Sequence, residues 1–195
     1  RLVVLGEPVA ELSERQLAPL RRRVSYLFQG GALFDSMSVF DNVAFPLREH
    51  LELQASALAA KVDELLGVVQ LAGAGTLAPS ELSGGMRKRV ALARALALDP
   101  EIILYDEPTT GLDPVTAMTI NRLIVDLNSR LATTSVVVTH DIASALFVAD
   151  RIAFLERGRF VFVGSPDEAR RSEVAALRAF LAAEEESGPR ETAAP

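Results

Sequence analysis

Hydrophobic positions along the chain switch between short continuous runs and helical stripes, and this order predicts an α/β fold. Residues 102–105 and 135–139 are continuous apolar or β-branched runs, which is typical of central strands in a parallel sheet. Between them, an N-cap at Asp113 followed by a proline predicts the start of a helix. One face of that helix is apolar and comprises Ile120, Leu123, Ile124, Leu127 and Leu131. A strand, a helix and a strand in this order predict a βαβ unit.

The segment nearest the amino terminus predicts two strands with a helix between them. Residues 2–5 and 24–28 are β-forming runs. The helix is expected to start at the capping box Ser13-x-x-Gln16 and to be interrupted near Pro19.

Further elements follow on both sides of the βαβ unit. Apolar residues recur at helical spacing from about residue 40 to 71, and again over 83–98. Beyond the βαβ unit, residues 151–156 and 159–163 are predicted to pair as a hairpin. A single helix is expected from about 166 to 183.

Composition narrows the class of protein. The chain has 195 residues, of which 49% are hydrophobic and 24% charged, with a net charge of −6 and a pI near 5.0. This acidic balance argues against nucleic acid as a partner. The sequence has no cysteine, which excludes disulfides, thiolate metal sites and cysteine nucleophiles. No apolar run approaches the ~20 residues that a membrane span needs.

Two consecutive carboxylates, Asp106 and Glu107, follow the first buried run. Such a pair resembles the Walker B motif of nucleotide hydrolases, in which the first acid holds Mg²⁺ and the second polarises the attacking water. Alternation along a strand predicts that the two side chains point to different sides. A solvated acidic turn would show the same pattern, so this motif alone leaves both interpretations open.

A second motif, Leu82-Ser83-Gly84-Gly85-Met86, lies shortly upstream of the acidic pair. Ser83 is an expected N-cap, and the glycines behind it leave backbone N–H groups open to an anion. Each glycine costs up to ~1 kcal/mol against alanine in a helix, so a purely structural helix start has little reason to carry two. The alternative is a flexible loop before a helix.

In this order and spacing, the two motifs resemble the ATP-binding-cassette (ABC) ATPases, whose signature is the L-S-G-G string. The resemblance implies an α/β P-loop NTPase core of the RecA-like type with an inserted helical subdomain, and ATP and Mg²⁺ as cofactors. It assigns Asp106 and Gln29, the Q-loop glutamine, to Mg²⁺. It assigns catalysis to Glu107, Gln29 and His140, the switch histidine after the second buried run.

The same resemblance implies a head-to-tail dimer with a second copy of the chain. In such proteins the signature residues of one subunit cover the ATP held by the other. Here those residues are Ser83, Gly84 and Gly85, and Asp113 of the D-loop joins them.

The resemblance also divides the chain into consecutive segments. They are a partial catalytic core ending in the Q-loop (1–40), a helical subdomain with the signature motif (41–98), a core segment with the Walker B motif, D-loop and switch histidine (99–166), a C-terminal helix (167–186) and a disordered tail (187–195).

The phosphate-binding loop of the family, G-x-x-x-x-G-K-[ST], does not occur in these 195 residues. Neither of the two lysines, Lys61 and Lys88, follows a glycine and precedes Ser or Thr. We expect the sequence to be the later part of a longer gene product, incomplete at its amino terminus. A truncated, non-catalytic regulatory or structural subunit is the alternative.

Residues 27–50 closely resemble the corresponding stretch of the Mla (MCE-type) ABC ATPases of bacterial phospholipid transport. In this fold the stretch receives the coupling helix of the permease, so Phe34, Met37 and Phe40 are expected to contact that partner. The implied partners are integral-membrane permease subunits and accessory lipid-binding subunits, without nucleic acid. The implied location is cytoplasmic, at the inner membrane through the permease. An ABC ATPase for another substrate class is the competing hypothesis.

Overall fold

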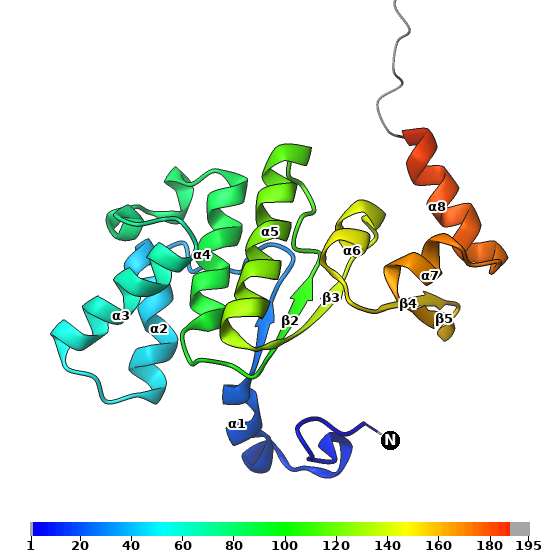
Figure 1. The fold of residues 1–195 in the computed structure, drawn as a ribbon. Helices are drawn as coiled ribbons and strands as arrows, with labels where there is room; N and C mark the ends of the chain where they lie inside the picture. Colours follow the sequence, from blue (N-terminus) through cyan, green and yellow to red (C-terminus); the bar gives the residue numbers. More distant parts are fainter. Residues whose placement is uncertain (1, 188–195) are drawn as a thin grey trace, which may run out of the picture. The chain divides into compact units, whose positions relative to one another are not determined.

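The computed structural model describes residues 2–187, which form two compact units with the boundary between Val138 and Thr139. The first unit holds a parallel sheet and the helices around it, and the described part of the second holds a hairpin and three helices (Figure 1). No helix among residues 2–187 is both long and apolar enough to cross a membrane.

Three parallel strands form the sheet of the first unit, in the order β1-β2-β3. They are β1 (Val24–Leu27), β2 (Ile102–Asp106) and β3 (Thr134–Val138). Leu27 pairs with Tyr105, and Asp106 pairs with Val138, so the carboxyl ends of the strands share one edge of the sheet. The helix α5 (Pro114–Leu131) joins β2 to β3, which confirms the predicted βαβ unit and the α/β class.

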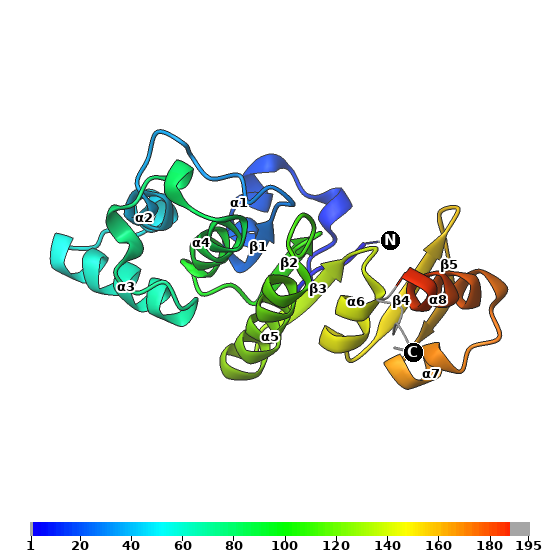
Figure 2. The same cartoon turned by 90° about the horizontal axis from the view of Figure 1, so that it is seen from above.

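Helices α4 (Gly84–Leu96) and α5 lie against one face of this sheet (Figures 1 and 2). That face buries Ile103 and Tyr105 of β2, which join the core formed with the apolar stripe of α5. The predicted stripe is wrong at Leu131, which is 48% exposed. Leu131 is the last residue of α5, where the left-handed backbone of Ala132 turns the chain away.

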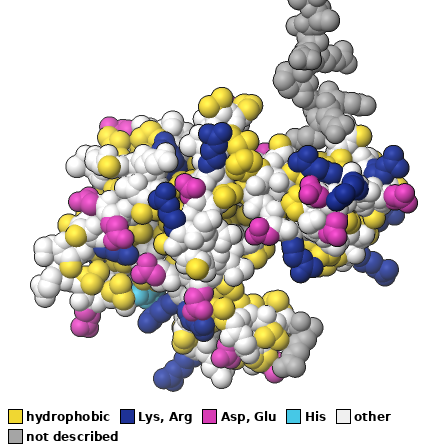
Figure 3. Space-filling model, in the orientation of Figure 1, with side chains coloured by type: hydrophobic (Ala, Val, Ile, Leu, Met, Phe, Trp, Pro, Cys, Tyr) yellow, Lys and Arg dark blue, Asp and Glu magenta, His cyan; other side chains and the backbone are white. Residues whose placement is uncertain are grey.

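The segment predicted to be a helical subdomain contains two helices that pack on α4. They are α2 (Val39–His50) and α3 (Ala55–Val68), with the short 3₁₀ turns η2 (Ala74–Thr76) and η3 (Pro79–Glu81) after them. The continuous helical pattern predicted over 40–71 is therefore interrupted. Its interruption falls at the exposed residues 51–54, which contribute nothing to the core. On the face drawn in Figure 3, acidic and basic side chains of this unit are interspersed with hydrophobic ones.

The structure departs from prediction near the amino terminus. The strand predicted at 2–5 is wrong: only an isolated bridge joins Val4 and Glu7, because left-handed backbone at Leu5 and Gly6 turns the chain at once. A 3₁₀ turn, η1 (Val9–Glu11), and the helix α1 (Glu14–Arg23) follow, with the predicted capping box present. The helix continues through Pro19, contrary to prediction. Proline has no N–H, so the carbonyl one turn before it has no donor within the helix. This side of the helix is exposed, and water can bond that carbonyl.

The second unit contains the predicted hairpin. Its strands are β4 (Ile152–Glu156) and β5 (Arg159–Gly164), which pair antiparallel across the turn Arg157-Gly158. Both turn residues have positive φ, as a two-residue hairpin turn requires. A short helix, α6 (Ile142–Val148), precedes the hairpin.

The prediction of a single helix over 166–183 is wrong. Two helices occupy the segment, α7 (Pro166–Arg170) and α8 (Ala175–Ser187). Between them the Ser172 hydroxyl accepts a bond from the N–H of Val174, a local turn that competes with helix. The tail predicted at 187–195 lies outside the described residues, apart from Ser187 at the end of α8.

Candidate functional site

The two acidic residues at the end of β2 meet different partners. Asp106, the last residue of the strand, accepts a hydrogen bond from the Tyr26 hydroxyl of β1 at 3.0 Å. Glu107 accepts one from the Thr110 hydroxyl at 2.8 Å. Strand alternation does not extend to Glu107, because its φ of +48° ends the extended backbone. Its N–H still bonds the Val138 carbonyl at 2.9 Å, which ties the turn to β3.

Tyr26 is a neighbour of the site that the sequence did not indicate. Its bond to Asp106 raises the pKa of the phenol above its ordinary value, since the neutral hydroxyl is the donor. The only sequence signal was its place in β1, and the register of the sheet was needed to bring it opposite the end of β2.

Gln29 lies two residues beyond the end of β1, at the same sheet edge as Asp106. Its side chain is exposed, and its backbone carbonyl accepts a hydrogen bond from Lys88 of α4. The structure therefore brings Gln29, Asp106 and Glu107 to one edge of the sheet. Their roles toward Mg²⁺ and water stay predictions.

Lys88 is the main feature of the site that sequence reasoning missed. Its side chain is buried, and its ammonium donates to the backbone carbonyls of Gln29 and of Glu107, the latter at 3.0 Å. Burial lowers the pKa of Lys88, although the charges of Glu107 and Asp106 oppose this shift. The available signal was its helical spacing, because Lys88 shares one face of α4 with the buried residues Gly85, Ala91 and Leu92.

The signature residues begin α4 as expected. Ser83 is the N-cap, and its hydroxyl accepts a bond from the Met86 N–H at 3.3 Å. The argument that two glycines lack a structural reason is wrong for Gly85. A Cβ built there would lie 2.4 Å from Thr116 Cγ2 of α5, so this glycine is required by packing whatever it binds.

Gly84 is less constrained. A Cβ there would lie 3.3 Å from Leu112 Cδ2, a tight contact that a small shift of Leu112 would relieve.

Asp113 caps α5. Its carboxylate accepts bonds from the N–H groups of Val115 and Thr116, both at 3.0 Å, and from the Thr116 hydroxyl. The Thr116 hydroxyl is the leading cause of the lowered pKa of Asp113.

His140 lies two residues beyond the end of β3, as predicted, and belongs to the second unit. Its role at the site stays a prediction.

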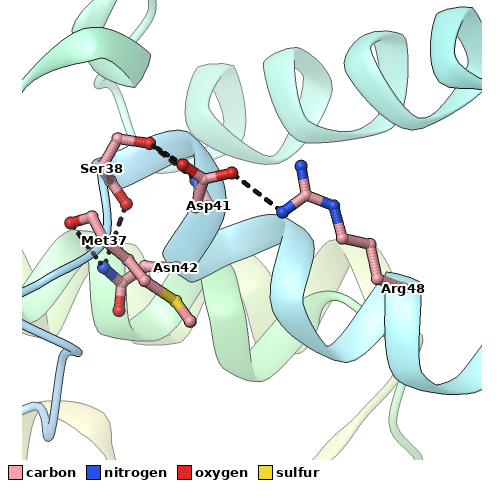
Figure 4. Close-up of polar contacts among 5 residues, drawn as sticks. All are labelled: Met37, Ser38, Asp41, Asn42 and Arg48. Atoms are coloured by element: carbon pink, nitrogen blue, oxygen red, sulfur yellow. Dashed lines mark hydrogen bonds and ion pairs between the residues drawn. The ribbon is translucent and has the colours of Figure 1, made fainter.

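The stretch predicted to meet a permease is organised around Asn42, which is fully buried. Its side chain accepts a bond from the Phe34 N–H at 2.8 Å and donates to the carbonyls of Phe34, Met37 and Ser38. Beside it, Asp41 accepts from Ser38 and pairs with Arg48 at 2.8 Å (Figure 4).

The predicted contact residues of this stretch are unequally available. Phe34 is 42% exposed and lies under the Arg94 guanidinium. Its ring packs against the tilted ring of Phe45, with 5.0 Å between the ring centroids. Met37 and Phe40 are half-buried, and Phe40 packs against the core. Phe34 is thus the predicted residue that offers the most surface.

The metal prediction fits a site completed by ligands outside the protein. Among residues 2–187, no group of three or more His, Cys, Asp or Glu side chains is placed to hold a metal ion. Mg²⁺ commonly takes one or two carboxylates together with water and phosphate oxygens. Asp106, with an oxygen of Gln29, has the donor chemistry for that mode.

Comparison with known families decides the affiliation of the chain. Residues 2–110, which include the Gln29 loop, the signature turn and the acidic pair, match the family described as ABC transporter. The chain belongs to the ABC transporter family. This confirms the resemblance predicted from the two motifs.

Relatives within the ABC transporter family include the intermembrane phospholipid transport system ATP-binding protein MlaF of Escherichia coli K12. It is 47% identical over 176 residues, which are 90% of this chain and 65% of MlaF. The chain thus spans less than two thirds of the length of this relative. The probable ribonucleotide transport ATP-binding protein mkl of Mycobacterium tuberculosis H37Rv is 43% identical over 92% of this chain and 50% of mkl.

Among solved structures, the ATP-binding cassette MJ0796, in a dimeric post-hydrolysis state with ADP and Pi, is similar with a TM-score of 0.76. It is 33% identical, and the match covers 84% of this chain and 72% of MJ0796. This likeness confirms the predicted ABC ATPase fold.

Proposed function

We propose that this chain is the ATP-binding and ATP-hydrolysing part of an ABC transporter that drives phospholipid transport between bacterial membranes. The observation that carries the hydrolytic part is the sheet edge where Gln29, Asp106 and Glu107 come together beyond β1 and β2. The name of MlaF, at 47% identity, supports the transport part.

Each residue of this edge has a distinct task in the proposed reaction. When Mg²⁺ is bound with ATP, it neutralises charge on the phosphate oxygens. Asp106 holds the ion through its carboxylate, and Gln29 supplies an amide oxygen toward it. Glu107 orients the attacking water and accepts its proton, and its carboxylate has acceptor positions for water beside the bond from Thr110.

The signature turn serves a nucleotide held by a second copy of the chain. Ser83 starts a helix of 13 residues, so its first N–H groups can meet phosphate oxygens across a two-fold interface. The dimeric state of MJ0796 supports a dimer, and the two chains are proposed to pack head to tail. The capping bonds of Asp113 hold its carboxylate next to Thr116, the residue that packs on Gly85. His140 is the residue proposed to contact the γ-phosphate.

Partners and location follow from the same proposal. Phe34, with smaller contributions from Met37 and Phe40, contacts an integral-membrane permease, which places the protein at the inner face of the inner membrane. Accessory lipid-binding subunits complete the transporter, and nucleic acid has no part in it.

Glu107→Gln, made in the full-length gene product, tests the hydrolytic proposal. The amide cannot accept the proton of water, so kcat for ATP is expected to fall by about 100-fold or more while ATP binding and ATP-dependent dimerisation persist. Phosphate release and gel filtration with ATP measure the two effects. Glu101→Gln is the matched control, since Glu101 precedes β2 and forms an exposed pair with Arg23. Near-normal turnover by Glu107→Gln would contradict the role of Glu107, and an inactive wild type would favour the non-catalytic alternative.

The substrate class needs a separate experiment because mkl, of similar identity, carries a ribonucleotide-transport name. The protein would be reconstituted with its own permease in vesicles that contain either labelled phospholipid or labelled ribonucleotide. ATP-dependent movement of phospholipid, lost in Glu107→Gln, is the expected result. Movement of ribonucleotide instead would overturn the lipid part and leave the hydrolytic part intact.

A further inference from the structure

Lys88 joins the signature helix to two strand ends. It lies in α4, past the turn that contains Ser83, and its side chain is 7% exposed. Its ammonium donates to the carbonyl oxygens of Gln29 and Glu107, the residues that follow β1 and β2. One buried cation thus joins α4 to the two segments that follow β1 and β2.

Packing alone does not account for a lysine at this place. Removing an ammonium from water is costly, and an apolar side chain of the same length would fill the space without that penalty. The Glu107 carboxylate takes a bond from Thr110, and Lys88 binds the backbone carbonyl of the same residue. The contacts of Lys88 with Gln29 and Glu107 therefore fix backbone position.

Two other cations of α4 show what is particular to Lys88. Arg94 donates to the carbonyl of Gly31 at 2.8 Å, so it holds the loop after β1 without reaching Glu107. Arg89 donates to the carbonyl of Gln70 at 3.2 Å, in the helical subdomain. Each makes the same kind of bond at a different place, which provides matched comparisons on one helix.

We propose that Lys88 is a positioning residue for ATP hydrolysis, which sets the backbone from which the Gln29 and Glu107 side chains reach the reacting phosphate. The inference rests on the proposed function. By joining both loops to α4, Lys88 makes the spacing of Gln29 and Glu107 depend on the helix that carries the signature residues. A displacement of about 1 Å at such a site can lower the rate by about 100-fold.

Kinetics of Lys88→Met in the full-length protein test the proposal. Methionine keeps the length and removes the donors, so kcat is expected to fall about 10-fold or more with KM for ATP changed less than about 2-fold. Lys88→Arg, which keeps donors, is expected to recover part of kcat. Arg89→Met is expected to retain the wild-type kcat. A Lys88→Met variant within about 2-fold of wild-type kcat, or an equal loss in Arg89→Met, would overturn the proposal.

Hydrogen exchange followed by mass spectrometry tests the same link without ATP. Lys88→Met is expected to raise deuterium uptake in both 28–33 and 107–112. Arg94→Met is expected to raise it in 28–33 alone, and Arg89→Met in neither segment. Unchanged uptake at 107–112 in Lys88→Met would overturn the proposal. Should Lys88→Met not fold, Lys88→Gln, which keeps one donor group, replaces it.

The two methods separate the failure of this inference from failure of the proposed function. A wild-type protein that does not hydrolyse ATP overturns the proposed function, and the exchange pattern still decides whether Lys88 holds both loops. A hydrolysing wild type with no effect of Lys88→Met overturns the inference alone.

Discussion

Replacement of Gly85 by alanine tests the close contact between α4 and α5. The new Cβ would lie 2.4 Å from Thr116 Cγ2, where ordinary contact requires at least 3.4 Å. Thr116 cannot easily rotate away, because it is β-branched and its hydroxyl bonds Asp113. Overpacking of this kind costs about 1–3 kcal/mol, and the helix preference of alanine returns about 1 kcal/mol. We therefore expect Gly85→Ala to lower the free energy of unfolding by about 1 kcal/mol.

A second substitution isolates the contact from other effects of the alanine. Thr116→Ser removes Cγ2 and keeps the hydroxyl that bonds Asp113, while the remaining Cβ would lie 3.9 Å from the new atom. In the double variant Gly85→Ala/Thr116→Ser the clash is absent, and only the helix preference of alanine remains. The double variant should therefore be more stable than the sum of the two single changes predicts, by about 1–2 kcal/mol.

Urea unfolding of all four proteins, followed by circular dichroism, measures this coupling free energy. A coupling below about 0.3 kcal/mol would refute the packing argument for Gly85. ATP hydrolysis by the double variant then separates packing from chemistry. If it folds stably but hydrolyses poorly, Gly85 is also needed at the nucleotide.

Two further substitutions test capping and burial. Asn42→Leu is expected to lower the free energy of unfolding by about 2–4 kcal/mol, because it removes a fully buried amide that accepts from the Phe34 N–H and donates to the carbonyls of Phe34, Met37 and Ser38; urea unfolding with no loss of stability would contradict this. Asp113→Ala is expected to lower the thermal midpoint at neutral pH by removing the α5 cap. Because the folded state lowers the pKa of Asp113 from its ordinary 3.8, the cap stabilises the fold fully above that pH and stops doing so as pH falls through the lowered pKa. The difference between wild type and variant should vanish there in thermal scans, and a difference that persists would count against a role for the carboxylate charge.

The sequence predicted the elements well wherever local structure depends on residues close together in the chain. Ser83 and Asp113 cap the helices they were expected to cap, and β2 and β3 fall on the two predicted strand runs. The expected burial of the second run is wrong, because β3 lies at the edge of the described sheet and exposes Val136 and Val138. The parallel pairing of β1 with β2, which only the structure shows, places Gln29 at the same edge as the acidic pair. Caps and buried runs depend on neighbours within a few residues, so they are visible in a single sequence.

The errors fall where the outcome depends on distant residues or on solvent. The run at 2–5 has strand composition, yet no neighbouring strand pairs with it in the described fold. Pro19 is tolerated because its side of α1 faces water. The packing of Gly85 on Thr116, and the bonds of Lys88, join residues that are far apart in sequence. Spacing along the chain contains no information about such contacts.

Because Lys88 bonds main-chain oxygens, its hydrogen bonds do not require particular side chains at positions 29 and 107. Exchanging Gln29 for alanine removes a reacting group and keeps the carbonyl that Lys88 bonds, whereas Glu107→Gln also removes a charge that raises the pKa of Lys88. The proposed reacting groups are side-chain atoms of Gln29 and Glu107, whereas the atoms that Lys88 bonds belong to the main chain of the same residues. A change of the Gln29 side chain can therefore be interpreted apart from a change of Lys88, because the two share no side-chain bond among those described.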